Sequence, residues 1–231
     1  MKNNNEHLFL EQKELIDTLS SKIIANLEEA ILHKGSASLL VSGGSTPKPL
    51  FEKLSSFDIP WEKVKNKHRD ERWIDKNHKD SNEKLVRDSL LVNFAKKAKF
   101  ISMYQEYINI EDAQDVCSNI YEKELFPFDV LILGMGNDGH TASLFPNNIK
   151  LKEALETTKG FCICMKPDTA PYERMSLTKT AILSATNIYL HFEGVEKQDV
   201  YKKVLEGASS NDMPVSAIIK QKKKKIEVYY K

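Results

Sequence analysis

Apolar residues follow two patterns along the chain, helical spacing and short continuous runs, and these patterns predict alternating helices and strands. Within residues 11–33 they fall three or four positions apart, the spacing of a helix with one buried face. Short apolar runs typical of buried strands cover 37–41, 100–103, 129–133, 161–165, 188–192, 215–219 and 226–230. Further helices are predicted over 81–95, 111–125, 176–184 and 196–206, and another from Pro47.

This alternation predicts an α/β fold, with a mostly parallel, doubly wound sheet and helices on both of its faces. No repeat, low-complexity linker or break in composition divides the chain, so residues 1–231 are predicted to form a single domain. One stretch departs from the pattern. Residues 65–69, with the sequence KNKHR, lie where a buried strand is due, yet they are entirely polar and favour an exposed edge or a loop.

Composition and charge exclude several classes of protein. Hydrophobic residues make up 41% and charged residues 29%, as in ordinary soluble proteins. The net charge of +1 favours neither a nucleic-acid partner nor a membrane surface. No leader-like segment or membrane-length apolar run is present, and three cysteines fit a reducing compartment, so we expect a cytoplasmic protein. Cys162 and Cys164 alternate onto one strand face, which favours core packing over a metal site.

The first candidate for chemistry is the segment Ser42-Gly43-Gly44-Ser45-Thr46-Pro47, which follows a predicted strand and precedes a helix. Two glycines permit a tight turn, and free amides at a helix N-terminus suit a phosphate group. A plain turn with a serine or threonine cap explains the same residues equally well. The segment lacks the pattern of a nucleoside-triphosphate loop.

A second candidate follows the strand predicted at 129–133. Its loop carries Asp138 and His140 among three glycines, and ligands of parallel sheets bind outside the carboxyl ends of the strands. A neutral imidazole can accept a proton from water near neutral pH, and Asp138 could orient the ring of His140. A lone histidine is more often structural, but closely spaced glycines allow a ligand to approach the backbone.

Three cations are also candidates for contact with an anion. Arg72 lies in the charged triplet at 70–72, which alone would indicate a solvated turn. Arg174 and Lys197 are predicted just before or at helix starts, where a cation opposes the helix dipole. Each would suit a phosphate or a developing oxyanion.

In this order the motifs resemble those of the 6-phosphogluconolactonase family. They are SGGSTP at 42–47, DERW at 70–73, DSN at 80–82, LGMGNDGHTASLFP at 133–146, PYERMSLT at 171–178, GVEK at 194–197 and MPVSAI at 213–218. The resemblance implies the broad fold of glucosamine-6-phosphate deaminase and ribose-5-phosphate isomerase. It also implies hydrolysis of 6-phospho-D-glucono-1,5-lactone to 6-phospho-D-gluconate in the oxidative pentose phosphate pathway, without a metal or an organic cofactor.

The resemblance also implies roles for individual residues. His140 would be the general base, with Asp138 and Arg72 beside it in the catalytic set. Substrate and phosphate contacts would fall on Gly43, Gly44, Ser45, Thr46, Arg72, Arg174 and Lys197. The polar stretch at 65–69 departs from the family, whose members carry an apolar strand there.

Other functions remain open at this stage. A sugar-phosphate isomerase or deaminase on the same fold is disfavoured because the segment TASLFP at 141–146 supplies no carboxylate. A non-catalytic sugar-phosphate sensor needs an assay to exclude it. A nicotinamide-dependent oxidoreductase fits only a mid-chain GxGxxG pattern. The expected partner is a small sugar phosphate, and the protein is expected to be a monomer or a small homo-oligomer.

Overall fold

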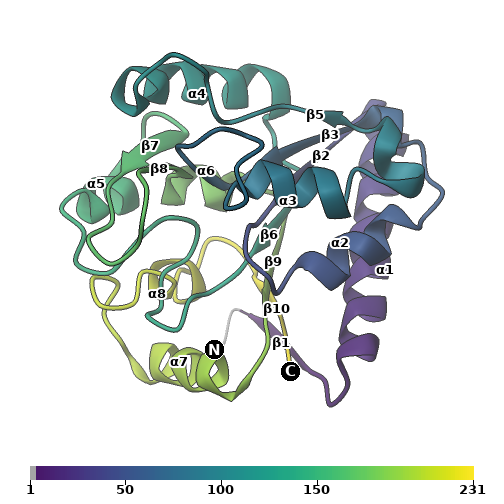
Figure 1. Ribbon diagram of the computed structural model, residues 1–231. Coiled ribbons are helices and arrows are strands. Elements are labelled where there is room, and N and C mark those ends of the chain that lie inside the picture. The colour runs from purple at the N-terminus through teal and green to yellow at the C-terminus, as the bar shows by residue number, and fades with distance from the viewer. Residues whose placement is uncertain (1–3) are drawn as a thin grey trace.

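Two β-sheets and the helices around them make up the computed structural model, which describes residues 4–231 (Figure 1). The larger sheet has seven strands, all paired in parallel, in the order β1-β10-β9-β6-β2-β3-β5. The smaller sheet is antiparallel and has the order β4-β8-β7. A mostly parallel α/β architecture is therefore confirmed, and the antiparallel sheet is an addition that the sequence pattern did not predict.

The strands of the large sheet are β1 (Asn5–Leu8), β2 (Ala37–Val41), β3 (Val64–His68), β5 (Lys99–Phe100), β6 (Val130–Leu133), β9 (Asn187–Phe192) and β10 (Glu227–Tyr230). Those of the small sheet are β4 (Asp70–Arg72), β7 (Cys162–Met165) and β8 (Arg174–Leu177). The α-helices are α1 (Gln12–Lys34), α2 (Lys48–Ser55), α3 (Asn82–Ser89), α4 (Ile110–Leu125), α5 (Leu151–Glu156), α6 (Lys179–Ser184), α7 (Val195–Glu206) and α8 (Ser216–Ile219). Two 3₁₀ turns lie at Trp61–Lys63 and Asn93–Lys97.

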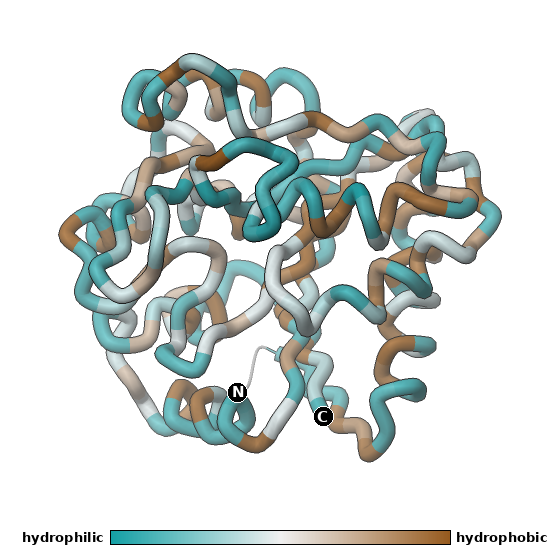
Figure 2. The backbone as a smooth tube through the Cα atoms, viewed as in Figure 1, coloured by the Kyte–Doolittle hydropathy of each residue, from teal (hydrophilic) through white to brown (hydrophobic). Residues whose placement is uncertain are grey.

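The two faces of the large sheet bury separate hydrophobic clusters. Leu39 and Val130 pack with α1, α2 and α3 on one face, whereas the adjacent Leu40 and Leu131 pack with α4 to α8 on the other. Successive side chains of a strand point to opposite faces, so near-continuous apolar strands are needed to fill both clusters. Figure 2 shows this hydrophobic centre, with hydrophilic segments around it.

Strand β3 corrects one prediction. Residues 64–68 form neither a loop nor an exposed edge, because they pair with β2 along their whole length and with β5 on the other side. Asn66, Lys67 and His68 are fully buried. Register with β2 puts the segment in the sheet despite its polar side chains, and several of these have no hydrogen-bond partner among the described residues.

Other boundaries also differ from the predictions. Residues 215–219 do not form a strand: Val215 caps the short helix α8, because short apolar runs do not distinguish helix from strand. The helix predicted over 176–184 begins only at Lys179, since Ser176 belongs to β8. The helix predicted over 81–95 ends at Ser89, and the strand predicted over 100–103 is confined to β5.

Candidate active site

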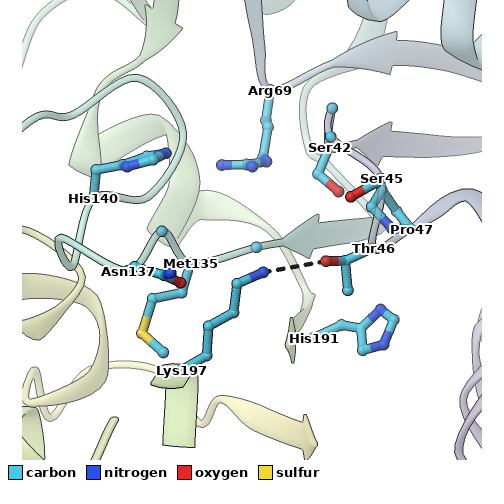
Figure 3. A pocket seen from close by; sticks show the side chains of 14 residues that line it. Ser42, Ser45, Thr46, Pro47, Arg69, Met135, Asn137, His140, His191 and Lys197 are labelled. Carbon is cyan, nitrogen blue, oxygen red and sulfur yellow. Dashed lines mark hydrogen bonds between the residues drawn. The ribbon is translucent and has the colours of Figure 1, made fainter. Parts of the chain in front are cut away.

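A cavity of about 230 Å³ opens where the carboxyl ends of the central strands meet (Figure 3). Its wall consists of the loop after β2, the loop after β6, one residue after β3, the end of β9 and the start of α7. The lining residues are Ser42, Gly43, Gly44, Ser45, Thr46, Pro47, Arg69, Gly134, Met135, Gly136, Asn137, His140, His191 and Lys197. This is the region in which ligands of parallel sheets bind.

The loop at 42–47 presents unpaired hydrogen-bond donors to this cavity. Within the described part of the chain, no hydrogen bond is made by the backbone N–H groups of Gly43, Gly44, Ser45 and Thr46. Gly44 adopts a φ of 91°, which favours glycine. Helix α2 begins immediately afterwards and has no side-chain cap, so neither Ser45 nor Thr46 is used as one. Free amides at a helix N-terminus form a site for an anion such as phosphate.

Asn82, at the start of α3, holds this loop from behind. A Cβ atom at Gly43 would lie 2.0 Å from the Asn82 Oδ1, so only glycine fits there. The same Oδ1 accepts a hydrogen bond from Arg72 Nη1 (2.6 Å). Glu71, which is 1% exposed, accepts from the backbone N–H of Asn82 (2.8 Å). Burial raises the pKa of Glu71 to about 7, although its backbone hydrogen bonds act in the opposite direction.

The imidazole of His140 is fixed in one orientation. Its Nδ1 lies 2.6 Å from Asp138 Oδ1, and its ring stacks on Phe145 with 4.6 Å between the centroids. Burial acts to raise the pKa of Asp138, but the hydrogen bond from His140 holds that pKa below its usual value. An ionised Asp138 favours the tautomer with the proton on Nδ1, which leaves the Nε2 lone pair free to accept a proton.

Glycines and a distant segment shape the loop that carries His140. A Cβ atom at Gly136 would lie 2.2 Å from the His140 Nδ1, so the ring packs directly on the Gly136 backbone. Gly139 has a φ of 80°, and its carbonyl oxygen accepts a hydrogen bond from the Val215 N–H (3.0 Å). The segment at 213–216 therefore supports the loop from outside the cavity.

Lys197 is the predicted cation that lines the cavity. It lies in the first turn of α7, and its Nζ donates to Thr46 Oγ1 (3.1 Å), as Figure 3 shows. Burial lowers its pKa, with Glu193 acting in the opposite direction. This contact joins the ammonium group to the loop of free amides, so both can bind the same anion.

Arg72 and Arg174 lie beside the cavity without lining it. They are register partners across the antiparallel strands β4 and β8. Arg174 is thus in a strand and not at a helix start as predicted; its Nη2 donates to the Pro171 carbonyl (3.0 Å), and its guanidinium lies 5.7 Å from the Phe145 ring centroid. The three predicted cations therefore do not share one position.

Sequence reasoning missed two charged or titratable residues of the cavity wall. His191, which no sequence motif singled out, lies near the end of β9 with its Nε2 3.1 Å from Glu193 Oε1. Arg69 follows β3, the segment whose strand was not predicted. The signal was available for His191, because the carboxyl ends of predicted parallel strands meet at one edge of the sheet.

Two further kinds of feature are absent from residues 4–231. No group of three or more histidine, cysteine, aspartate or glutamate side chains there is arranged to hold a metal ion. In that same range no helix is both long and apolar enough to cross a membrane. The three cysteines are buried and free.

Comparisons with known proteins agree with the geometry. The family model described as glucosamine-6-phosphate isomerases/6-phosphogluconolactonase matches residues 10–228. A 6-phosphogluconolactonase from Rhizobium meliloti (strain 1021) is 36% identical over 227 residues, which are 98% of each chain. One from Helicobacter pylori (strain 26695) is 37% identical and covers 84% of this chain and 83% of its own. The crystal structure of a 6-phosphogluconolactonase from Shewanella baltica OS155 superposes with a TM-score of 0.95 at 41% identity, covering 98% of this chain and 97% of that one.

Proposed function

The chain belongs to the 6-phosphogluconolactonase family, and we propose that it hydrolyses 6-phospho-D-glucono-1,5-lactone with His140 as the general base. The observation that carries this proposal is the pairing of His140 Nδ1 with Asp138 opposite a loop of free amides in one cavity. The pair supplies a proton acceptor, and the loop supplies a binding site for the phosphate.

The reaction needs neither a covalent nucleophile nor a metal ion. A water oxygen attacks C1 of the lactone while His140 Nε2 accepts the water proton, and the carbonyl electron pair moves onto its oxygen. When this tetrahedral oxyanion collapses, the bond from C1 to the ring oxygen breaks and the ring oxygen takes the proton from His140. Positioned proton transfer of this kind contributes about 10²–10⁴-fold to the rate.

The phosphate group fixes the lactone for this attack. We assign it to the backbone amides of Gly43, Gly44, Ser45 and Thr46, together with Lys197, because these donors converge at one end of the cavity. Arg72 and Arg174 add positive charge behind the wall. Binding of this remote group orients C1 toward His140 and so accelerates the reaction.

A sugar-phosphate isomerase or deaminase is less consistent with the cavity. Among the described residues that line it, none is an aspartate or a glutamate, so no carboxylate there can shuttle a proton between C1 and C2. Asp138 lies behind the imidazole and is engaged by it.

The test is the initial rate of hydrolysis of freshly made lactone, with spontaneous hydrolysis subtracted and His140→Asn measured alongside. We expect the wild-type protein to accelerate the reaction and His140→Asn to lose about 10²–10⁴-fold in kcat, with 6-phosphogluconate affinity retained. Wild-type-like turnover in the variant would remove His140 as the base. A folded wild-type protein that binds 6-phosphogluconate without catalysis would instead be a sensor.

A further inference from the structure

Arg69 places a buried positive charge in the cavity wall, where it pairs with Asp70 at 3.6 Å without a hydrogen bond between them. The residue is only 5% exposed, and its Nε and Nη1 atoms make no hydrogen bond to any described residue. The nearest carboxylate is that of Asp70, whose Oδ1 lies 3.6 Å from Arg69 Nε, beyond hydrogen-bond range. The other Asp70 oxygen is occupied by Ser143 Oγ at 2.7 Å.

The fold holds this guanidinium in place. The backbone N–H of Arg69 donates to Val41 (3.0 Å) and its carbonyl accepts from Leu177 (2.8 Å), so the residue joins the large sheet to the small one. Its Nη2 lies 3.6 Å from the position that a Cβ of Gly134 would occupy. The side chain therefore lies against bare backbone at the end of β6 and extends into the cavity.

A buried cation with unused donors is costly unless a negative group completes it. Arginine cannot relieve this cost by losing its proton. Arg69 Nη2 also makes no hydrogen bond to a described residue, and unlike Nε and Nη1 it is not sealed off, so it is the donor that an anion or a strongly polar oxygen in the cavity can reach. Figure 3 shows the guanidinium directed from the opposite wall toward His140, whereas the contact between Lys197 and Thr46 lies on another side.

We propose that Arg69 binds the oxygen on C1 of the substrate: the lactone carbonyl oxygen, the oxyanion that forms there, and the carboxylate of the product. This assignment rests on the proposed function, in which His140 acts at C1 and the phosphate lies on the 43–46 loop. The accessible end of the guanidinium can donate a charge-assisted hydrogen bond to a developing oxyanion or to an oxygen of a carboxylate. Because the guanidinium is already in place, it stabilises the developing charge without reorganisation.

Arg69 thereby takes the role that the sequence suggested for Arg72. Arg72 lies three residues later, outside the cavity lining, with its Nη1 bound to Asn82. Its charge supports the site from behind, whereas Arg69 makes the direct contact.

The test separates the C1 end of the ligand from its phosphate end. Arg69→Met and Arg69→Lys are compared with wild type in kcat and KM, and in calorimetric affinity for two ligands. 6-Phosphogluconate carries both a phosphate and a C1 carboxylate, whereas glucitol 6-phosphate carries the phosphate alone. Lys65→Met is the matched control, because Lys65 lies on β3, the strand that leads to Arg69, but pairs with Glu124 (3.2 Å) away from the cavity.

For Arg69→Met we expect kcat to fall about 10²–10³-fold with little change in KM. Affinity for 6-phosphogluconate should fall about 10- to 100-fold, while affinity for glucitol 6-phosphate stays unchanged. Arg69→Lys should recover part of both losses, since it restores the charge without the fork. If thermal melting shows that Arg69→Met is unfolded, the same comparison of ligands is made with Arg69→Lys.

Two results would overturn the assignment. An equal loss of affinity for both ligands would place Arg69 at the phosphate, and no loss for either would leave it without a ligand contact. Failure of the proposed function has a different signature. In that case wild type would not accelerate lactone hydrolysis, whereas the preference for 6-phosphogluconate would still depend on Arg69.

Discussion

Lys67 offers a test of how much the polar strand β3 costs the fold. Its side chain is fully buried, and its Nζ has no hydrogen-bond partner among the described residues. The ammonium group instead lies 3.7 Å from the centroid of the Tyr121 ring. Burial lowers the pKa of Lys67 to about 8, although the neighbouring Cys162 and Cys117 act to raise it.

The sign of the effect on stability follows from that lowered pKa. A lysine whose pKa is lower in the folded state than in the unfolded state destabilises the fold as the pH falls from the unfolded-state pKa to the folded-state pKa. The resulting loss in the free energy of unfolding, here called the deficit, is absent above pH 10.5 and complete below about pH 8. At 1.36 kcal/mol for each pKa unit the deficit is about 3 kcal/mol, and the contact with Tyr121 offsets up to about 2 kcal/mol of it.

We therefore expect Lys67→Met, which keeps the unbranched chain and removes the charge, to stabilise the protein by about 1–3 kcal/mol at pH 7. The measurement is the free energy of unfolding in urea at pH 7 and again near pH 10. The advantage of the variant should shrink at the higher pH. Lys65→Met on the same strand should show no such dependence, because Lys65 reaches the surface and pairs with Glu124. A variant less stable than wild type by the same amount at both pH values would refute the reasoning.

Two other substitutions test the two ends of the loop at 42–47. Lys197→Ala should raise KM for the lactone and weaken binding of glucitol 6-phosphate about 10-fold or more, because it removes the cation bound to Thr46; unchanged affinity would place the phosphate elsewhere. Gly43→Ala should destabilise the protein by about 1–3 kcal/mol, since its Cβ would overlap the Asn82 amide. Lys65→Met, measured in the same thermal melts, is the control. A melting temperature unchanged by Gly43→Ala would show that Asn82 moves aside freely.

The sequence predicted the parts of this protein in which local pattern and burial agree. The strands at 37–41 and 130–133 fill two cores, and their continuous apolar runs revealed them. The pairing of Asp138 with His140 was also foreseeable, because two residues of one loop form it. That all 231 residues form one domain stays a prediction.

Other features depend on contacts between distant segments and were not predictable in this way. Strand β3 is placed by pairing with β2 and β5, against the preference of its own side chains. Because that strand was not predicted, the sequence did not place Arg69 at the cavity. Arg72, in the charged triplet at 70–72, was predicted as the catalytic arginine instead. Likewise, Val215 was expected in a strand because its hydrogen bond to Gly139 is a tertiary contact that periodicity does not reveal.

The position of β1 has a consequence for synthesis on the ribosome. This strand lies at the edge of the large sheet, and among the described strands its one neighbour is β10, with Asn5 matched to Glu227 and Leu8 to Tyr230. A ribosome adds roughly 5–20 residues per second, so the strand waits on the order of ten seconds or more for its partner. An unpaired edge is a template for association with other nascent chains, and polar side chains reduce that hazard. The sequence NEHL of β1, with three polar residues in four, therefore limits association of this strand with other chains before β10 is synthesised.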